Sequence, residues 1–344
     1  MSKDLTTSSV ARSNVLNNRY ALSRLEEHLA LGGLRIEGEV LFFKSHVAEL
    51  LDIDERTIDR YLAGHEQELK QNGYRVLRGK SLKDIKLAQV DDIDVVDLIG
   101  AKVPSLGVFS FRAVLNLAML VTESERAKAI RSRMLDIVLD VVAERTGGHT
   151  RFINQRDQDY LPSAFMEESY RKQFTSALCN HVDMGNHKYA VFTDKIYQVV
   201  FCENAREYKQ VLRLSEGDST RDTMYAEVLN TLAAFESGLA ASIQQQALQL
   251  GRKLKSVEVD ALLAQAASNP YLKPLIDAAR TRMASRDLGF REALHHKLEA
   301  YVQAIPESDF ERFLGERSQA LEERSVFVKL VVASPYADCL AEST

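Results

Sequence analysis

The segment KSHVAELLDIDERTIDRYLA, residues 44–63, has apolar residues at the positions that two short helices joined by a tight turn must bury. Asp54 is a favourable N-cap residue for the second helix. Asp52 stands in the turn, and Asp tolerates left-handed backbone better than most residues. The pattern therefore predicts a helix-turn-helix, with Ala48 at the closest helix crossing and a shared core of Val47, Leu51, Ile53, Ile58 and Tyr61.

The second helix of this pair would present a charged outward face made of Glu55, Arg56, Thr57, Asp59 and Arg60. In a DNA-binding unit, that face enters the major groove. We predict that Arg56, Thr57 and Arg60 contact bases or nearby phosphates. The two acidic residues either accept from cytosine amino groups or indicate that this face meets a protein. The alternative interpretation of the segment is an ordinary helical hairpin inside a larger all-α protein.

A basic segment follows the predicted recognition helix. GYRVLRGKSLKDIKL, residues 73–87, alternates apolar and polar residues on both sides of Gly79, which predicts a two-stranded wing. Six cations lie between Lys70 and Lys86 against one anion, Asp84, in a chain whose formal net charge is −5. We predict DNA-backbone contacts from Arg75, Arg78, Lys80 and Lys83. The alternative is a solvated hairpin whose lysines keep an edge strand from pairing.

Length, composition and charge exclude several classes of protein. A chain of 344 residues, 45% of them hydrophobic, is long enough for two or three globular domains. It has no apolar run of transmembrane length, and its polar start MSKDLTTSSV lacks the hydrophobic region of a signal peptide. We therefore expect a cytoplasmic protein without a membrane partner. Three widely spaced cysteines predict reduced thiols, and the negative net charge excludes a histone-like binder.

The predicted fold is mainly α: an N-terminal winged helix-turn-helix followed by a helical C-terminal domain. An N-terminal helix, with a pattern over 10–31 that stops at Gly32 and Gly33, occupies residues 1–35. The winged helix-turn-helix spans 36–90, and a helical connector spans 104–146. The helical C-terminal domain covers 161–332, with a tail at 333–344. Its helices are predicted near 164–183, 193–213, 219–250, 256–267, 270–281, 288–304 and 308–332.

Signals for catalysis and metal binding are weak, so we predict no catalytic residues, no metal and no cofactor. Cys179, His181, His187 and Cys202 lack the paired spacing of a zinc site. There is no phosphate-binding GxxxxGK[ST] loop and no GxSxG elbow. One rival remains, because Arg291 and His296 on one helix resemble the R-x4-H motif of HEPN ribonucleases. A basic helix making salt bridges is the simpler interpretation.

Several longer segments carry a family resemblance. The helix-turn-helix, GYRVLRGKSLKDIKL and SFRAVLNLAMLVTESERAKAIRSRMLDIV resemble the N-terminal half of the RhuM-type, phage-antirepressor-like bacterial family. FTDKIYQVVF, TRDTMYAEVL and SRDLGFREALHHKL are similar to its C-terminal part, sometimes described as Fic/Doc-related. The resemblance implies a prokaryotic DNA-binding protein found with mobile or defence genes. The phosphate-holding H-x-F-x-[DN]-x-N-[GK]-x-R loop of Fic enzymes is absent from the sequence, so nucleotidyl transfer is not supported.

Together these features predict a sequence-specific DNA-binding regulator in which residues 36–87 read double-stranded DNA. We expect a homodimer or higher homo-oligomer, because a second reader raises affinity through effective concentration. The C-terminal domain would supply its interface through Leu229, Leu232, Phe235 and Leu239. The alternative is an interaction module for a protein encoded by a neighbouring gene, such as a toxin, a nuclease or a restriction subunit. The acidic recognition face and the apolar stripe from Met224 to Ile243 motivate it.

Overall fold

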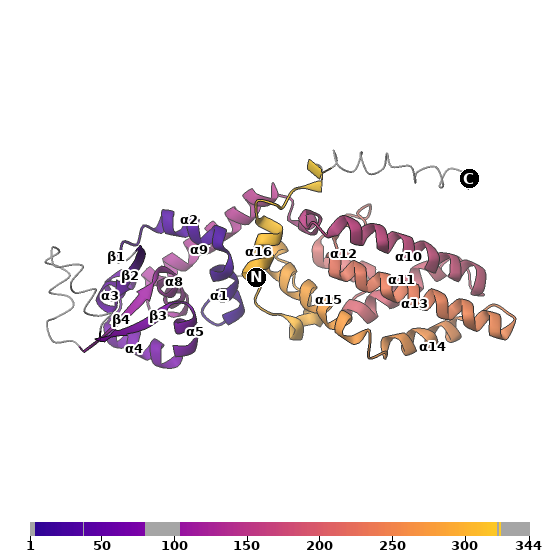
Figure 1. Ribbon diagram of the computed structural model, residues 1–344, viewed down its shortest axis with the longest axis horizontal. Coiled ribbons are helices and arrows are strands. Elements are labelled where there is room, and N and C mark those ends of the chain that lie inside the picture. The colour runs from indigo at the N-terminus through magenta and orange to yellow at the C-terminus, as the bar shows by residue number, and fades with distance from the viewer. Residues whose placement is uncertain (1–3, 37, 80–103, 322, 325–344) are drawn as a thin grey trace. The chain divides into compact units, whose positions relative to one another are not determined.

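The computed structural model describes residues 4–36, 38–79, 104–321 and 323–324, and these are mainly helical with one small sheet (Figure 1). The prediction of a mainly helical fold is confirmed. The chain divides into two compact units, Met1–Val141 (unit 1) and Val142–Thr344 (unit 2). The division falls inside helix α9 (Glu125–Thr146), near the end of the segment 104–146 that was predicted as a helical connector. None of the described helices has the length and apolarity needed to cross a membrane.

Unit 1 contains an antiparallel sheet with the strand order β1-β2-β4-β3. The strands are β1 (Leu34–Ile36), β2 (Glu39–Phe43), β3 (Tyr74–Arg78) and β4 (Ser105–Ser110). Phe42 of β2 pairs with Phe109 of β4, and Tyr74 of β3 pairs with the same Phe109. The described partner of β3 is thus β4, a strand that the sequence pattern did not predict. The second wing strand predicted after Gly79 lies outside the described residues.

The segment predicted to form two helices does so. Helices α3 (Lys44–Leu51) and α4 (Glu55–Gly64) are joined by Asp52, whose backbone is left-handed with φ 52° and ψ 55°. Asp54 caps α4, because its Oδ1 accepts from the Thr57 N–H at 2.9 Å. Of the residues expected in the shared core, Val47, Leu51 and Ile58 are buried, and Ile53 and Tyr61 are partly buried.

The rest of unit 1 packs around these helices and the sheet. Its helices are α1 (Ser9–Asn17), α2 (Arg19–Leu29), α5 (Glu66–Gln71), α8 (Phe111–Leu120) and the first part of α9. Helix α8 is the centre of the core, since its residues 113–120 are all buried. The single helix predicted over 10–31 is wrong. Asn18 breaks it, because the Asn18 side chain accepts from the Ala21 N–H at 3.1 Å and starts α2 anew.

An ion pair between buried Arg12 and partly buried Glu68 joins three helices of unit 1. Arg12 of α1 donates from Nε and Nη2 to the carboxylate of Glu68 on α5, at 2.6 and 2.8 Å. Asn116 of α8 donates to the same carboxylate at 2.7 Å. Burial alone would raise the pKa of Glu68, but the hydrogen bonds from Arg12 and Asn116 together lower it. The pair therefore stabilises the packing of α1 and α5 on α8 while Glu68 is ionised.

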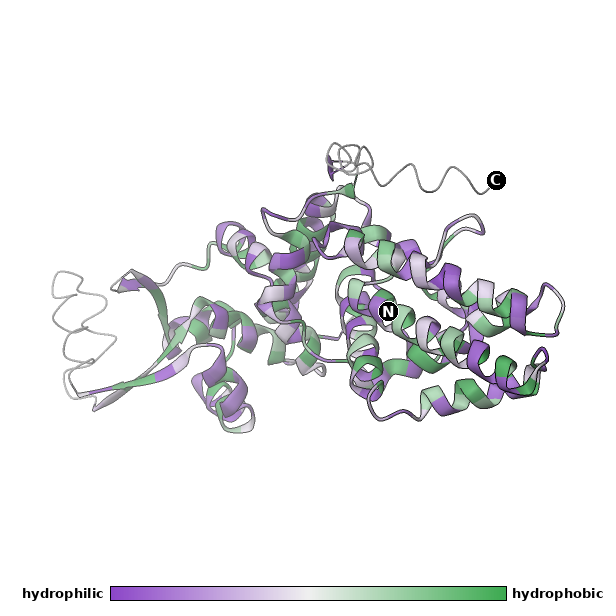
Figure 2. Cartoon of the chain, turned by 45° about the vertical axis from the view of Figure 1, so that its right-hand side comes forward, coloured by the Kyte–Doolittle hydropathy of each residue, from purple (hydrophilic) through white to green (hydrophobic). Residues whose placement is uncertain are grey.

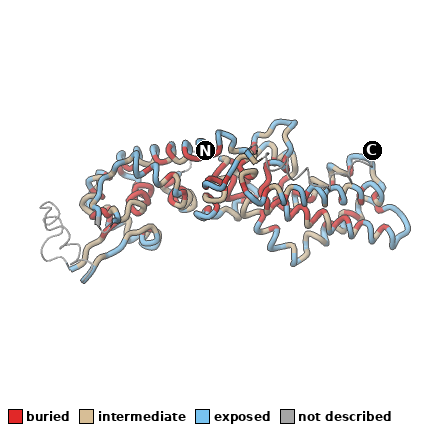
Figure 3. Tube along the Cα trace, turned by 45° about the horizontal axis from the view of Figure 1, so that its top comes forward, coloured by how far each residue is buried: buried red, intermediate tan, exposed pale blue. Residues whose placement is uncertain are grey.

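Unit 2 is a helical domain in which α13 (Ala226–Leu250) is central and packs against α10, α11, α14 and α15. Apolar and polar residues alternate along these helices (Figure 2), and their buried residues line the interior (Figure 3). The other elements are η1 (Thr150–Arg156), α10 (Tyr160–His181), α11 (Lys188–Phe201), α12 (Ala205–Leu212), η2 (Arg221–Thr223), α14 (Ser256–Ala267), α15 (Lys273–Arg286), η3 (Asp287–Arg291), η4 (His296–Tyr301) and α16 (Glu307–Leu314).

The apolar stripe of α13 is covered by its own chain. The four residues proposed as an oligomer interface are at most 1% exposed: Leu229, Leu232, Phe235 and Leu239. The expectation that they exceed what an intrachain core needs is wrong. Helix α13 packs against α10, α11, α14 and α15, and α10 makes the most extensive of these contacts. The stripe therefore belongs to the core of unit 2.

Two predicted helices of unit 2 are interrupted. The helix expected over 193–213 is two helices, because Cys202 is left-handed and Asn204 with Glu207 forms a capping box that starts α12. The helix expected over 288–304 is wrong: a π-turn, Asp287–Arg291, is followed by left-handed Glu292 and the 3₁₀ turn η4. This irregular path places the side chains of Asp287 and His295 in one buried cluster.

Candidate nucleic-acid interface and a buried charge network

The three predicted base-contacting residues of helix α4 differ in exposure and in their intramolecular contacts. Arg56 is exposed in the first turn and has no ion pair among the described residues. Thr57 is partly buried, and Asp54 already accepts from both its N–H and its Oγ1, at 2.9 and 3.4 Å. Arg60 is exposed but forms an ion pair with Glu123, just before α9, and its guanidinium lies 5.2 Å from the ring centroid of Tyr61. Arg56 is thus the least constrained of the three.

The predicted backbone-contacting residues of the wing are only partly described. Arg75 of β3 pairs with Glu39 of β2, with 2.7 Å between Nη2 and Oε2. Arg78 is exposed and has no ion pair in the part of the chain that the structure covers. Lys80 and Lys83 lie outside the described residues. Burial raises the pKa of Tyr74, which packs against the same hydrophobic core as Ile58 of α4.

A second cluster, in unit 2, is a buried charge network centred on His295. Its Nδ1 lies 2.8 Å from Glu203 Oε2, and its Nε2 lies 2.7 Å from Asp287 Oδ2. Asp287 also accepts from the Tyr225 hydroxyl at 2.8 Å and forms an ion pair with Arg291 Nε at 3.1 Å. None of the side chains in these ion pairs is more than 4% exposed.

The geometry of this network requires a charged His295, because both ring nitrogens face carboxylates and must both donate. Burial alone would lower the pKa of His295, but the hydrogen bonds that its ring donates to Asp287 and Glu203 raise it to about 9. Burial would likewise raise the pKa of Asp287, yet Arg291 and His295 lower it. With His295 protonated, two cations balance two carboxylates, which is the condition under which burying them is tolerable.

The network predicts that unit 2 loses stability as the pH rises. His295 has a folded pKa of about 9, above its ordinary value of 6.5, so its contribution is complete below pH 6.5 and is lost as the pH rises through 9. A difference of this size corresponds to about 3 kcal/mol. Urea unfolding at pH 6, 7.5 and 9 measures it, with His295→Gln as the reference that removes this titration. Equal pH dependence in both proteins would contradict the assignment.

The HEPN-like pair is not brought together. Arg291 is 2% exposed and held by Asp287, and its Nη2 donates to the Thr223 carbonyl at 2.7 Å. His296 is 71% exposed and lies against Glu299. The prediction that the two residues share a helix is wrong, because the helical path ends at Glu292. Within the described residues, no group of three or more side chains is arranged to hold a metal ion.

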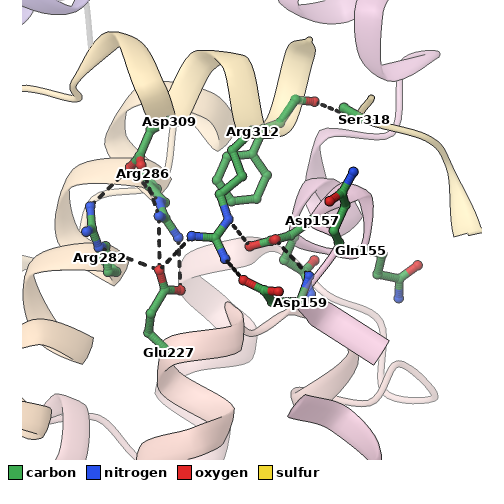
Figure 4. Close-up of polar contacts among 12 residues, drawn as sticks. Gln155, Asp157, Asp159, Glu227, Arg282, Arg286, Asp309, Arg312 and Ser318 are labelled. Carbon is green, nitrogen blue, oxygen red and sulfur yellow. Dashed lines mark hydrogen bonds and ion pairs between the residues drawn. The ribbon is translucent and has the colours of Figure 1, made fainter. Parts of the chain in front are cut away.

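Another set of ion pairs in unit 2 joins α13, α15, α16 and the turn between η1 and α10 (Figure 4). Arg286 is almost fully buried, with Nε 2.8 Å from Asp309 and Nη1 3.0 Å from Glu227. Its guanidinium lies 4.7 Å from the ring centroid of Phe313. Arg312 pairs with Asp157 at 2.7 Å and with Asp159 at 2.6 Å. These contacts join residues far apart in sequence, so no local sequence motif predicts them.

In both buried clusters, the charged side chains named above are paired with side chains of opposite charge, as expected for groups that hold unit 2 together. The exposed arginines of α4 and β3 remain the candidate binding residues of the chain. No protein-family model and no curated protein sequence matches this chain.

Proposed function

We propose that unit 1 binds double-stranded DNA as a winged helix-turn-helix, with α4 as the recognition helix and β3 beside it contacting the backbone. The observation that carries the proposal is the anchoring of α4. Its inner side is fixed by fully buried Ile58 and its start by the Asp54 cap, while Arg56 is exposed and has no ion pair among the described residues. An arginine on a rigid helix is suited to bidentate contact with guanine in the major groove.

The proposal extends to the class of protein. The resemblance to RhuM-type proteins supports a prokaryotic regulator, or a DNA binder encoded with mobile or defence genes. A homodimer would place two recognition helices on half-sites about 34 Å apart. Because the apolar stripe of α13 is buried in its own chain, the dimer contact has to use other surfaces. Its stoichiometry on DNA is measurable by light scattering of the complex.

Selection from a randomised duplex pool, followed by fluorescence anisotropy with the full-length chain, tests DNA binding directly. We expect Arg56→Ala to weaken binding to the selected duplex by about 1–3 kcal/mol and to relax the preference at one base pair. Arg78→Ala should weaken all duplexes alike and reduce the slope of log K against log salt by about 0.9. Arg206→Ala is the control, because Arg206 is exposed on α12 in unit 2.

Two results would contradict the DNA-binding proposal. One is the absence of binding to any duplex at about 50 mM salt, a concentration at which phosphate contacts are strong. The other is binding that Arg56→Ala and Arg78→Ala change no more than Arg206→Ala does.

A protein-interaction role is the second candidate, and the two carboxylates on α4 favour it. Glu55 and Asp59 are exposed on the same helix as Arg56, and carboxylates repel DNA phosphates. The partner would be the product of a neighbouring gene, and co-expression followed by size-exclusion chromatography tests it. A stable complex that Glu55→Lys disrupts, together with no DNA binding, would replace the DNA proposal by this one.

A further inference from the structure

Three cations on or beside the proposed DNA-binding face are already paired with carboxylates of the same unit. Lys44 pairs with Asp59 at 2.7 Å, and Arg75 pairs with Glu39 at 2.7 Å. Arg60 pairs with Glu123. Glu39 lies on β2 and Glu123 lies before α9, so these two carboxylates come from outside the recognition helix. Arg56 and Arg78 have no such partner among the described residues.

The pairs lie at the surface, where a phosphate has access to the same arginines. Arg60 is 62% exposed and Glu123 is 41% exposed, while Arg75 is 52% exposed and Glu39 is 62% exposed. Exposed ion pairs are weak. A DNA phosphate can therefore displace the carboxylate, but the net gain is smaller than for an unpaired arginine.

Glu123 is held in place independently of Arg60. The Tyr61 hydroxyl donates to Glu123 Oε2 at 2.6 Å, and the Thr122 N–H donates to the same oxygen at 3.0 Å. The next residue, Ser124, caps α9 by accepting from the Ala127 N–H at 3.0 Å and also donates to the Leu51 carbonyl of α3. The Glu123 carboxylate is thus fixed beside α4, where it forms the ion pair with Arg60.

We propose that Glu39 and Glu123 compete with DNA phosphates for Arg75 and Arg60, and so suppress binding to non-target DNA. The inference rests on the proposed function of unit 1. On any duplex, each arginine exchanges a carboxylate for a phosphate, so the exchange adds little binding free energy. On the target, base contacts from α4 add binding free energy beyond this exchange. The two glutamates then lower the sequence-independent part of the affinity, so that tight binding depends on base contacts from α4.

The test compares full-length Glu39→Gln, Glu123→Gln and the double variant on a random-sequence duplex and on the selected duplex. We expect each single change to raise affinity for the random duplex about threefold at low salt, and to steepen the salt slope by about 0.9 for each arginine released. Affinity for the selected duplex should rise by the same factor, because Arg60 and Arg75 contact phosphates on both duplexes. Glu125→Gln is the matched control, because Glu125 is exposed on the same stretch of chain but pairs with Lys128.

A double-mutant cycle with Arg60→Ala identifies the route of the effect. If Glu123 acts by holding Arg60, Glu123→Gln should raise affinity in the wild-type background and leave it unchanged in the Arg60→Ala background. The inference is overturned if the glutamate variants match Glu125→Gln, or if the gain survives Arg60→Ala, while wild-type DNA binding still stands. If neither the wild type nor any variant binds DNA, both the inference and the proposed function are overturned.

Discussion

His295→Ala is expected to lower the free energy of unfolding of unit 2 by about 3–5 kcal/mol, the cost of removing one partner from a buried ion pair. The substitution leaves Glu203 buried without its cation and deprives Asp287 of one of its two cationic partners. His296→Ala is the matched control. His296 is the adjacent histidine but is 71% exposed on a surface ion pair, so its removal should leave stability nearly unchanged.

Urea unfolding of the full-length chain, with hydrogen exchange to localise the effect, measures this difference. Faster exchange in α13 and α15 is expected for His295→Ala, whereas amides of α8 in unit 1 serve as an internal reference. Equal losses of stability for His295→Ala and His296→Ala would contradict the buried network.

Arg12→Ala is expected to destabilise unit 1 by about 3 kcal/mol, because it leaves the carboxylate of Glu68 without its cation. Arg12 is 4% exposed, and its Nη1 also donates to the Leu5 carbonyl at 2.8 Å. The substitution therefore removes both the ion pair and the hydrogen bond to the Leu5 carbonyl. Lys128→Ala is the control, since its ion pair with Glu125 is exposed and contributes little.

A double variant separates the ion pair from the packing of these helices. Arg12→Met combined with Glu68→Leu replaces both charges by apolar side chains and should cost less than Arg12→Ala alone. Denaturant unfolding of the single and double variants gives the coupling energy. Additive losses would show that Arg12 and Glu68 act independently.

Much of the local structure could be predicted from the sequence. Helices α3 and α4, the left-handed turn at Asp52 and the Asp54 cap occur where the pattern of residues 44–63 predicted them. Helix α14 spans the predicted residues 256–267. These features depend on residues within about one helical turn of each other, so a single segment carries the whole signal.

The candidate binding residues were predicted only as exposed cations, because their ion pairs depend on the chain path. Arg60 and Glu123 are brought together only by the packing of α4 against the start of α9. Arg75 similarly reaches Glu39 from another strand. The sequence pattern identified the cations but carried no signal for the carboxylates that neutralise them.

The sequence by itself determined where most helices form and which of their sides are apolar. Only the tertiary structure decided that β3 pairs with β4, that the stripe of α13 is buried within unit 2, and that His295 lies between Glu203 and Asp287. Helix periodicity and capping are local, whereas strand pairing and buried ion pairs join residues whose separation in sequence is arbitrary. His295 and Glu203 are 92 residues apart, and they meet because the folded chain buries both charges together.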